Sequence, residues 1–233
     1  MNTQNKTILM IRERTQAADF IAELDMQGPV VFAPMVQIVP MQVDQVLPNA
    51  TGIIFTSANA VRFYAKATKD RNAQVYCVGS QTERAAKGAG FRVTQRFETA
   101  AQLVAHFNAM PNPLSGIFYP RAETVAVDIA KELSDAGHHI EDAIFYRQAF
   151  QALPDKAKGL IESSSLIVPI FSHQIAKRFR QGLIFVKPCD LTIMCISTYV
   201  ASVFDDLSGF RIDIAQKPTR AAMVDKIKAS LLA

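Results

Sequence analysis

Hydroxyl-bearing residues recur where predicted strands end and predicted helices begin. A helix N-terminus offers unpaired backbone N–H groups and the positive end of its dipole, so it binds carboxylates and phosphates well. The recurrence therefore indicates a site for a ligand with several negative groups, although serine and threonine are also ordinary helix N-caps. The residues at these positions are Thr56 and Ser57 after 52–55, Ser172 after 166–170, and Ser197 and Thr198 after 191–196.

The chain lacks the motifs of the common nucleotide-binding and nucleophilic sites. No GxGxxG follows a strand, and neither GxxxxGK[ST] nor GxSxG occurs. Cys77 and Cys195 fall inside predicted buried strands, where a thiol packs as a small hydrophobe. Catalysis would then depend on positioning and proton donation, and Tyr146, in a long extended segment, is a candidate acid. A purely structural role for Tyr146, packing within that segment, is an equally good explanation.

Histidines and cysteines are not spaced as metal ligands. His138 and His139 are neighbours that would point in opposite directions on a strand, and no two cysteines form a CxxC pair. His173 directly follows a predicted strand and is the one histidine placed to reach a ligand. We therefore expect no metal site.

Composition narrows the class of protein further. A chain of 233 residues with 49% hydrophobic content can bury two ordinary cores. No apolar run reaches membrane-spanning length and no signal peptide is evident, so we expect a cytoplasmic protein with no membrane partner. The net charge of +4 favours acidic ligands, but no dense Lys/Arg run exists, which argues against nucleic acid.

Short apolar runs alternate with stretches of helical periodicity along the chain. This alternation predicts an α/β protein with parallel sheets, whose ligands bind beyond the carboxyl ends of the strands. Val125, Ile129 and Leu133 recur at helical spacing and predict a helix that ends at Gly137. Two long extended segments, 30–40 and 140–150, stand apart from the alternating pattern.

The strand-and-loop pattern occurs twice, roughly 110–120 residues apart. Two copies of one small α/β unit imply two lobes with a cleft between them, where a ligand would bind. The strand-bearing stretches correspond as 9–12 with 118–121, 53–61 with 168–176, 77–80 with 195–198, and 90–93 with 209–212.

A second set of short motifs runs in order along the chain: Ile54–Val61, Val78–Thr82, the run Leu133…Gly137…Ile140…Phe145-Tyr146-Arg147, Cys195-Ile196-Ser197 with Val200-Ala201, and Pro218-Thr219. In this order the motifs resemble the uroporphyrinogen-III synthase family. The resemblance covers essentially the whole chain and departs from the family pattern at His173, where proline is usual, and at Tyr199, where threonine is common.

The resemblance implies two flavodoxin-like parallel-sheet lobes joined by a two-stranded β-linker. One lobe would combine residues 1–37 with 150–233, the other would span 38–149, and the linkers would lie near 36–40 and 147–153. The residues alone also allow two consecutive lobes.

The implied reaction closes hydroxymethylbilane, a linear tetrapyrrole with eight carboxylates, with loss of water and inversion of the last pyrrole ring. Tyr146 matches the tyrosine that the family suggests as proton donor, and a substrate carboxyl or ordered water could share that role. The positions expected to hold substrate carboxylates are Thr56, Ser57, Asn59, Gly79, Thr82, Ser172, Ser197 and Thr198. On charge alone, we expect electrostatic attraction from Arg12, Arg62, Arg121 and Arg147.

The resemblance and the residues leave other functions open. A non-catalytic two-lobed protein could close on a small polyanionic ligand, as a binding protein or a sensor, without turnover. We expect a monomer whose partner is the small-molecule substrate, with transient contact to the preceding pathway enzyme as a further possibility.

Overall fold

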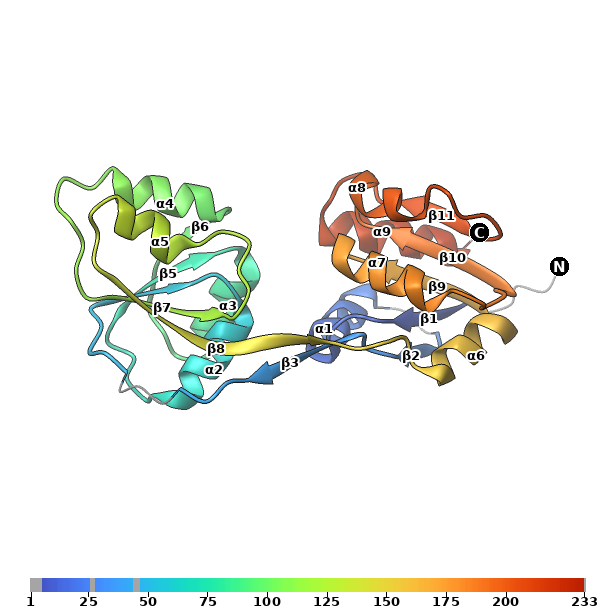
Figure 1. Cartoon of the computed structure of the whole chain (residues 1–233), viewed down its shortest axis with the longest axis horizontal. Helices are drawn as coiled ribbons and strands as arrows, with labels where there is room; N and C mark the ends of the chain where they lie inside the picture. The colour runs from blue at the N-terminus through green and yellow to red at the C-terminus, as the bar shows by residue number, and fades with distance from the viewer. Residues whose placement is uncertain (1–5, 26–27, 44–46, 233) are drawn as a thin grey trace. The chain divides into compact units, whose positions relative to one another are not determined.

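The computed structural model describes residues 6–25, 28–43 and 47–232 of the chain (Figure 1). The chain divides into two compact units, one made of Met1–Gln37 with Ala149–Ala233 and the other of Ile38–Gln148. Each unit is built on its own sheet, and both sheets are mainly parallel.

The discontinuous unit holds a five-stranded sheet in the order β11-β10-β9-β1-β2. The strands 165–170 and 190–195 are almost continuously apolar, so both faces of the sheet must be covered from water. Helices lie on both faces and cover them. Its strands are β1 (Thr7–Met10), β2 (Val30–Phe32), β9 (Ser165–Ile170), β10 (Asp190–Cys195) and β11 (Arg211–Ile214). Its helices are α1 (Arg14–Leu24), α6 (Asp155–Ser163), α7 (His173–Gly182), α8 (Thr198–Ala201), the 3-10 turn η1 (Ser202–Phe204) and α9 (Arg220–Leu232).

The continuous unit contributes to a six-stranded sheet in the order β3-β8-β7-β4-β5-β6. Helices α4 and α5 cover one face of this sheet, and α2 and α3 cover the other. The strands are β3 (Val36–Pro40), β4 (Gly52–Phe55), β5 (Gln74–Val78), β6 (Val93–Phe97), β7 (Ile117–Ala122) and β8 (Ile140–Phe150). The helices are α2 (Ala58–Ala67), α3 (Ser80–Gly88), α4 (Ala100–Asn108) and α5 (Ile129–Asp135).

The two sheets share one spatial order although the chain enters them at different points. The order β2-β1-β9-β10-β11 is the flavodoxin-like arrangement, and β8-β7-β4-β5-β6 repeats it with β7 and β8 in the places of β1 and β2. The stretches that correspond in the sequence therefore occupy equivalent strands, for example 53–55 on β4 and 168–170 on β9. This arrangement confirms the predicted α/β fold with parallel sheets.

Strands β3 and β8 span the points at which the chain passes between the units, and they are neighbours in the sheet order. The backbone N–H of Met41 donates to the Phe145 carbonyl at 2.9 Å, and that of Gln151 donates to the Met35 carbonyl at 3.0 Å. Two extended segments far apart in the sequence thus run beside each other at these crossings.

Helix α5 is shorter than the sequence predicts. It begins at Ile129, because the Asp128 side chain caps it by accepting from the Lys131 backbone N–H at 3.1 Å, and Val125 lies before it.

Among the described residues, no helix has the length and apolar character needed to cross a membrane.

Candidate functional site

Each sheet has a topological switch point, at which the order of the strands along the chain reverses. In the continuous unit this switch point lies between β4 and β7, and in the discontinuous unit it lies between β1 and β9. Ligands of open parallel α/β sheets bind outside the carboxyl ends of the strands at such points. The residues that follow β4, β7, β1 and β9 are therefore the first candidates for ligand contact.

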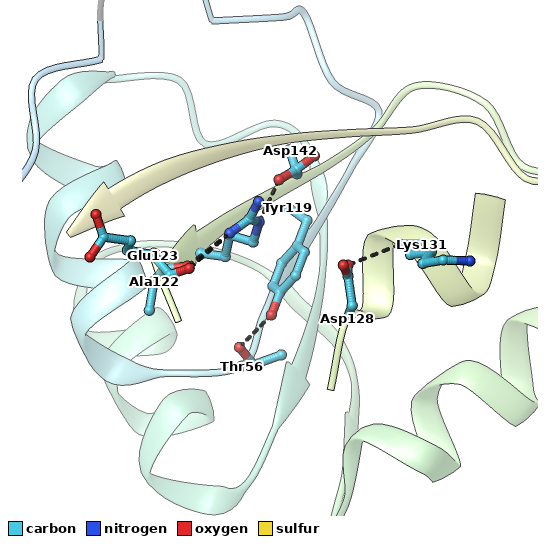
Figure 2. A network of polar contacts seen from close by, with 8 residues as sticks. Thr56, Tyr119, Ala122, Glu123, Asp128, Lys131 and Asp142 are labelled. Carbon is cyan, nitrogen blue, oxygen red and sulfur yellow. Dashed lines mark hydrogen bonds and ion pairs between the residues drawn. The ribbon is translucent and has the colours of Figure 1, made fainter. Parts of the chain in front are cut away.

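Thr56 and Ser57 directly follow β4 in the continuous unit. Ser57 is the N-cap of α2 in an extended backbone conformation, and its Oγ accepts from the Asn59 backbone N–H at 3.1 Å. The Thr56 hydroxyl lies 3.1 Å from the phenol oxygen of Tyr119 on β7 (Figure 2). Because strand side chains alternate, these consecutive hydroxyls leave the strand toward opposite faces of the sheet.

Tyr146 reaches the α2 face because β8 carries a bulge. Arg121 pairs with Ile144 but the next residue, Ala122, pairs with Tyr146, so one residue of β8 is extra at this point. Phe145 and Tyr146 consequently pack in the same apolar cluster, whereas an unbroken strand would send them to opposite faces. The bulge therefore aims the Tyr146 ring at the start of α2.

The phenol of Tyr146 is buried and remains protonated at neutral pH. Burial raises its pKa above the ordinary tyrosine value, while a hydrogen bond with the Ser57 side chain and the positive charge of Arg62 act in the opposite direction. The ring is 4% exposed and stacks on Phe63 of α2. A proton-bearing oxygen is thus held beside the N-cap of α2, as a general acid requires.

Tyr119 is a residue that the sequence reasoning missed. Its side chain is 1% exposed, and burial raises the pKa of its phenol while the Thr56 hydrogen bond opposes that rise. Tyr119 lies on β7 and Thr56 directly follows the neighbouring strand β4. Strand alternation indicates the face of Tyr119, but it does not indicate that the two strands are neighbours.

The other candidates of the continuous unit lie near the carboxyl ends of β4 and β5. Asn59 is buried in the first turn of α2, and Arg62, one turn further, lies with its guanidinium carbon 4.8 Å from the centroid of the Phe63 ring. Gly79 caps α3 at a φ of +82°, where a side chain would be strained but would meet no atom within 4 Å. Thr82 is buried in the first turn of α3.

The two remaining candidate arginines of this unit, Arg121 and Arg147, differ in their surroundings. Arg121 forms an ion pair with Asp142 on β8 and also donates to the Ala122 carbonyl at 3.1 Å. Its charge is therefore largely compensated by Asp142. Arg147, directly after Tyr146 on β8, is exposed.

The discontinuous unit presents a second set of helix starts. Ser172 caps α7 and accepts from the Ile175 backbone N–H at 3.3 Å, and Ser197 caps α8 and accepts from that of Val200, also at 3.3 Å. Thr198 is the first residue of α8 and is exposed. These caps follow the neighbouring strands β9 and β10, so they lie at one edge of the sheet.

His173 and Tyr199 join the two helix starts by stacking. Their ring centroids are 4.2 Å apart and their planes are inclined by 11°. Both residues occupy positions at which the chain departs from the family pattern described above, and the structure shows that these two departures contact each other.

Arg12 follows β1, and its guanidinium packs against an aromatic ring. Its guanidinium carbon lies 4.3 Å from the centroid of the Phe171 ring, and its Nη2 donates to Gln16 at 2.6 Å. Burial, followed by repulsion from Arg220, lowers its pKa to about 10, so it remains charged at neutral pH. A desolvated cation at a strand end favours the approach of an anion.

The described residues therefore present two sets of groups suited to anions, one in each unit. Each set combines capped helix starts with an arginine, and the set at β4 adds two buried phenols. Within the described part of the chain, no group of three or more His, Cys, Asp or Glu side chains is arranged to hold a metal ion.

Comparison with solved structures shows which known proteins share this fold. The uroporphyrinogen-III synthetase of Helicobacter pylori 26695 is 16% identical and superimposes with a TM-score of 0.67, covering 97% of this chain and 99% of that one. A mutant uroporphyrinogen III synthase from the extremely thermophilic bacterium Thermus thermophilus, also 16% identical, has a TM-score of 0.53 with coverage of 97% and 99%. At these identities the likeness establishes a shared two-sheet α/β fold.

Sequence comparison supplies the family. The model of the uroporphyrinogen-III synthase HemD family matches residues 19–225, which is most of the chain. The chain therefore belongs to the uroporphyrinogen-III synthase family. No curated protein sequence matches it.

Proposed function

We propose that this chain is a uroporphyrinogen-III synthase, which closes hydroxymethylbilane with loss of water and inversion of the last pyrrole ring. The observation that carries the proposal is the placement of Tyr146. Its buried, protonated phenol meets Ser57, the cap of α2, at the carboxyl end of β4. Family membership over 19–225 supports the same activity.

Tyr146 is the proposed proton donor. Hydroxide is a poor leaving group, so the hydroxymethyl oxygen must receive a proton as the carbon–oxygen bond breaks. The raised pKa keeps the phenol protonated, and the Ser57 hydrogen bond stabilises the phenolate that forms after transfer. The azafulvenium cation left behind is then attacked by the substituted carbon of the last pyrrole ring, which requires a fixed substrate conformation.

The helix starts are the proposed carboxylate sites. Backbone N–H groups and hydroxyls bind carboxylate oxygens without adding a full positive charge, so several can be placed around one flexible substrate. Those proposed for this role are Thr56, Ser57, Asn59, Gly79, Thr82, Ser172, Ser197 and Thr198. We propose Arg12, Arg62 and Arg147 as sources of electrostatic attraction, with Arg121 contributing less because Asp142 pairs with it.

The proposed enzyme is a hydro-lyase that needs no cofactor and acts as a cytoplasmic monomer. All three cysteines are free, as is usual in a reducing compartment. Large exposed apolar side chains among the described residues are few and mostly dispersed, which suits a chain without a permanent partner: Phe32, Met41, Ile184, Phe185, Tyr199 and Ile214.

Multiple-turnover kinetics separate this enzyme from a binding protein. Hydroxymethylbilane is supplied in large excess over the chain, and its consumption is followed together with the product isomers. The enzyme converts many equivalents to the type III macrocycle. A non-catalytic binding or sensor protein would protect only one equivalent and leave the remainder to close spontaneously without inversion, which would contradict the proposal.

A further inference from the structure

The phenol of Tyr119 is buried at the switch point between β4 and β7. It is 1% exposed, and its side chain belongs to the apolar cluster beneath α4 and α5. The paired register of β4 and β7 ends at Ile53 with Phe118, and Pro120, which follows Tyr119, has no N–H to extend it. Tyr119 directly follows the last paired residue of β7 and packs in the same apolar cluster as Ile54 of β4. Its oxygen reaches Thr56 at 3.1 Å (Figure 2).

Either hydroxyl could donate this hydrogen bond, and the surroundings of the two oxygens favour one direction. Burying a phenol proton without an acceptor destabilises the folded protein. Among the described residues, the hydrogen-bond partner of the Tyr119 phenol is Thr56. Thr56 is only partly buried, so its own proton can point outward. Tyr119 consequently donates and the Thr56 oxygen accepts.

This direction determines what Thr56 presents at the end of β4. A threonine hydroxyl has one proton, and its oxygen is already accepting from Tyr119. The Thr56 proton is thus available to an outside acceptor, and the rotation of the hydroxyl is restricted by the fixed phenol. Charged groups near the Tyr119 oxygen are Arg121, which is compensated by Asp142, and Asp128, whose carboxylate accepts from the Lys131 backbone.

We propose that Tyr119 is a positioning residue, which donates to Thr56 and thereby directs the Thr56 hydroxyl proton toward a carboxylate oxygen of the substrate. This role rests on the proposed function, because Thr56 is one of the proposed carboxylate contacts. It assigns a task to a residue outside the group of strand-end hydroxyls. Tyr119 itself does not touch substrate.

Tyr119→Phe removes the donor and keeps the ring. We expect KM for hydroxymethylbilane to rise about three- to tenfold with kcat within about twofold, because orientation of a ground-state contact is lost and the reacting atoms are not touched. The matched control is Tyr76→Phe. Tyr76 lies in the same apolar cluster, and its hydroxyl donates to Gln74 at 3.0 Å. Gln74 is at the amino end of β5, whereas the proposed substrate contacts lie at the carboxyl ends of the strands. This variant should therefore leave KM unchanged.

A double-mutant cycle with Thr56→Val tests whether Tyr119 acts through Thr56. The double variant should raise KM no further than Thr56→Val alone, because the second change removes a donor whose target is already gone. It should also melt at a higher temperature than Thr56→Val, which leaves the buried phenol unpaired. A merely structural role for Tyr119 would instead give independent, additive effects.

The outcomes distinguish this role from the proposed function. Type III product from the wild-type chain, together with an unchanged KM in Tyr119→Phe or additive effects in the cycle, would overturn the positioning role alone. A wild-type chain that forms no type III product would overturn both.

Discussion

The ring of Tyr146 stacks on that of Phe63, with centroids 5.6 Å apart and planes inclined by 30°. Phe63 belongs to α2, whose N-cap Ser57 acts on the pKa of the phenol of the same tyrosine. The bulge in β8 sets the face on which Tyr146 lies, and the stack on Phe63 restrains its ring. The cap residue Ser57 restrains its hydroxyl. Such restraint is what a proton donor needs, because transfer depends on the position of one oxygen atom.

Tyr146→Phe should lower kcat by about 10²-fold or more, the usual contribution of a general acid. KM should change little, since the ring and its stack on Phe63 remain. The measurement is steady-state formation of type III product, with circular dichroism to confirm that the variant is folded.

Tyr64→Phe is the matched control for this substitution. Tyr64 is 4% exposed in the same apolar cluster and contacts the rings of Phe55 and Phe118. Its change should leave kcat within about twofold, because no proposed step uses its hydroxyl. Equal losses from both variants, or full activity of Tyr146→Phe, would assign Tyr146 to packing.

Ser57→Ala should lower both stability and kcat. Loss of an N-cap costs about 0.5–2 kcal/mol, and loss of the hydrogen bond to the phenol destabilises the phenolate formed on proton transfer. Thr99→Ala removes the equivalent cap of α4, where Thr99 accepts from Gln102 at 3.2 Å. We expect similar shifts in urea midpoint for the two variants and a fall in kcat for Ser57→Ala alone; a matching fall in both would reduce Ser57 to a cap.

Arg12→Gln should raise KM about tenfold and weaken the dependence of KM on ionic strength, because a desolvated cation at a strand end is lost. Arg178→Gln is the control, since Arg178 also lies over a phenylalanine ring, at 4.4 Å from the centroid of Phe150, but within α7. Steady-state kinetics from low to moderate salt give the comparison. Identical salt dependence in wild type and Arg12→Gln would remove Arg12 from the electrostatic account.

The protein should lose stability as pH rises above about 9. Burial raises the pKa values of Cys77 and Cys195 from 9.0 to about 12. It also raises those of Tyr64, Tyr76, Tyr119 and Tyr146. A group with a higher pKa in the folded state contributes its stability fully below its unfolded pKa and loses it as pH rises toward the folded value. Each buried thiol should account for about 1–1.5 kcal/mol at pH 10.

Urea unfolding between pH 7 and 10.5 measures this effect. The variant Cys77→Ala with Cys195→Ala should be less stable at neutral pH, where it leaves small cavities, but its decline from pH 8 to 10 should be shallower. A flat profile for the wild type over this range would show that these groups ionise alike in the folded and unfolded chain.

Much of the fold could be predicted because the chain repeats itself. Strand identity follows from short apolar runs, and the repeat places 53–55 and 168–170 on equivalent strands of two like sheets. Ser57, Ser172 and Ser197 are N-caps as expected, since a hydroxyl after a buried strand has few other local roles. Local rules are enough for such features.

Features that depend on pairing between distant segments could not be predicted. The bulge opposite Ala122 decides which face Tyr146 occupies, and nothing in the sequence of β8 marks the extra residue. The partnership of Thr56 with Tyr119 requires knowing that β4 and β7 are neighbours. Helical periodicity at Val125 predicts too early a start for α5, because the Asp128 side chain caps the helix at Ile129.

The most direct test of the central claim is the isomer composition of the product. Hydroxymethylbilane is incubated with increasing amounts of the chain, the products are oxidised, and the two uroporphyrin isomers are separated. We predict that the type III fraction rises with the amount of chain until it accounts for nearly all product. Type I product alone at every amount, while a synthase of known activity yields type III under the same conditions, would contradict the account.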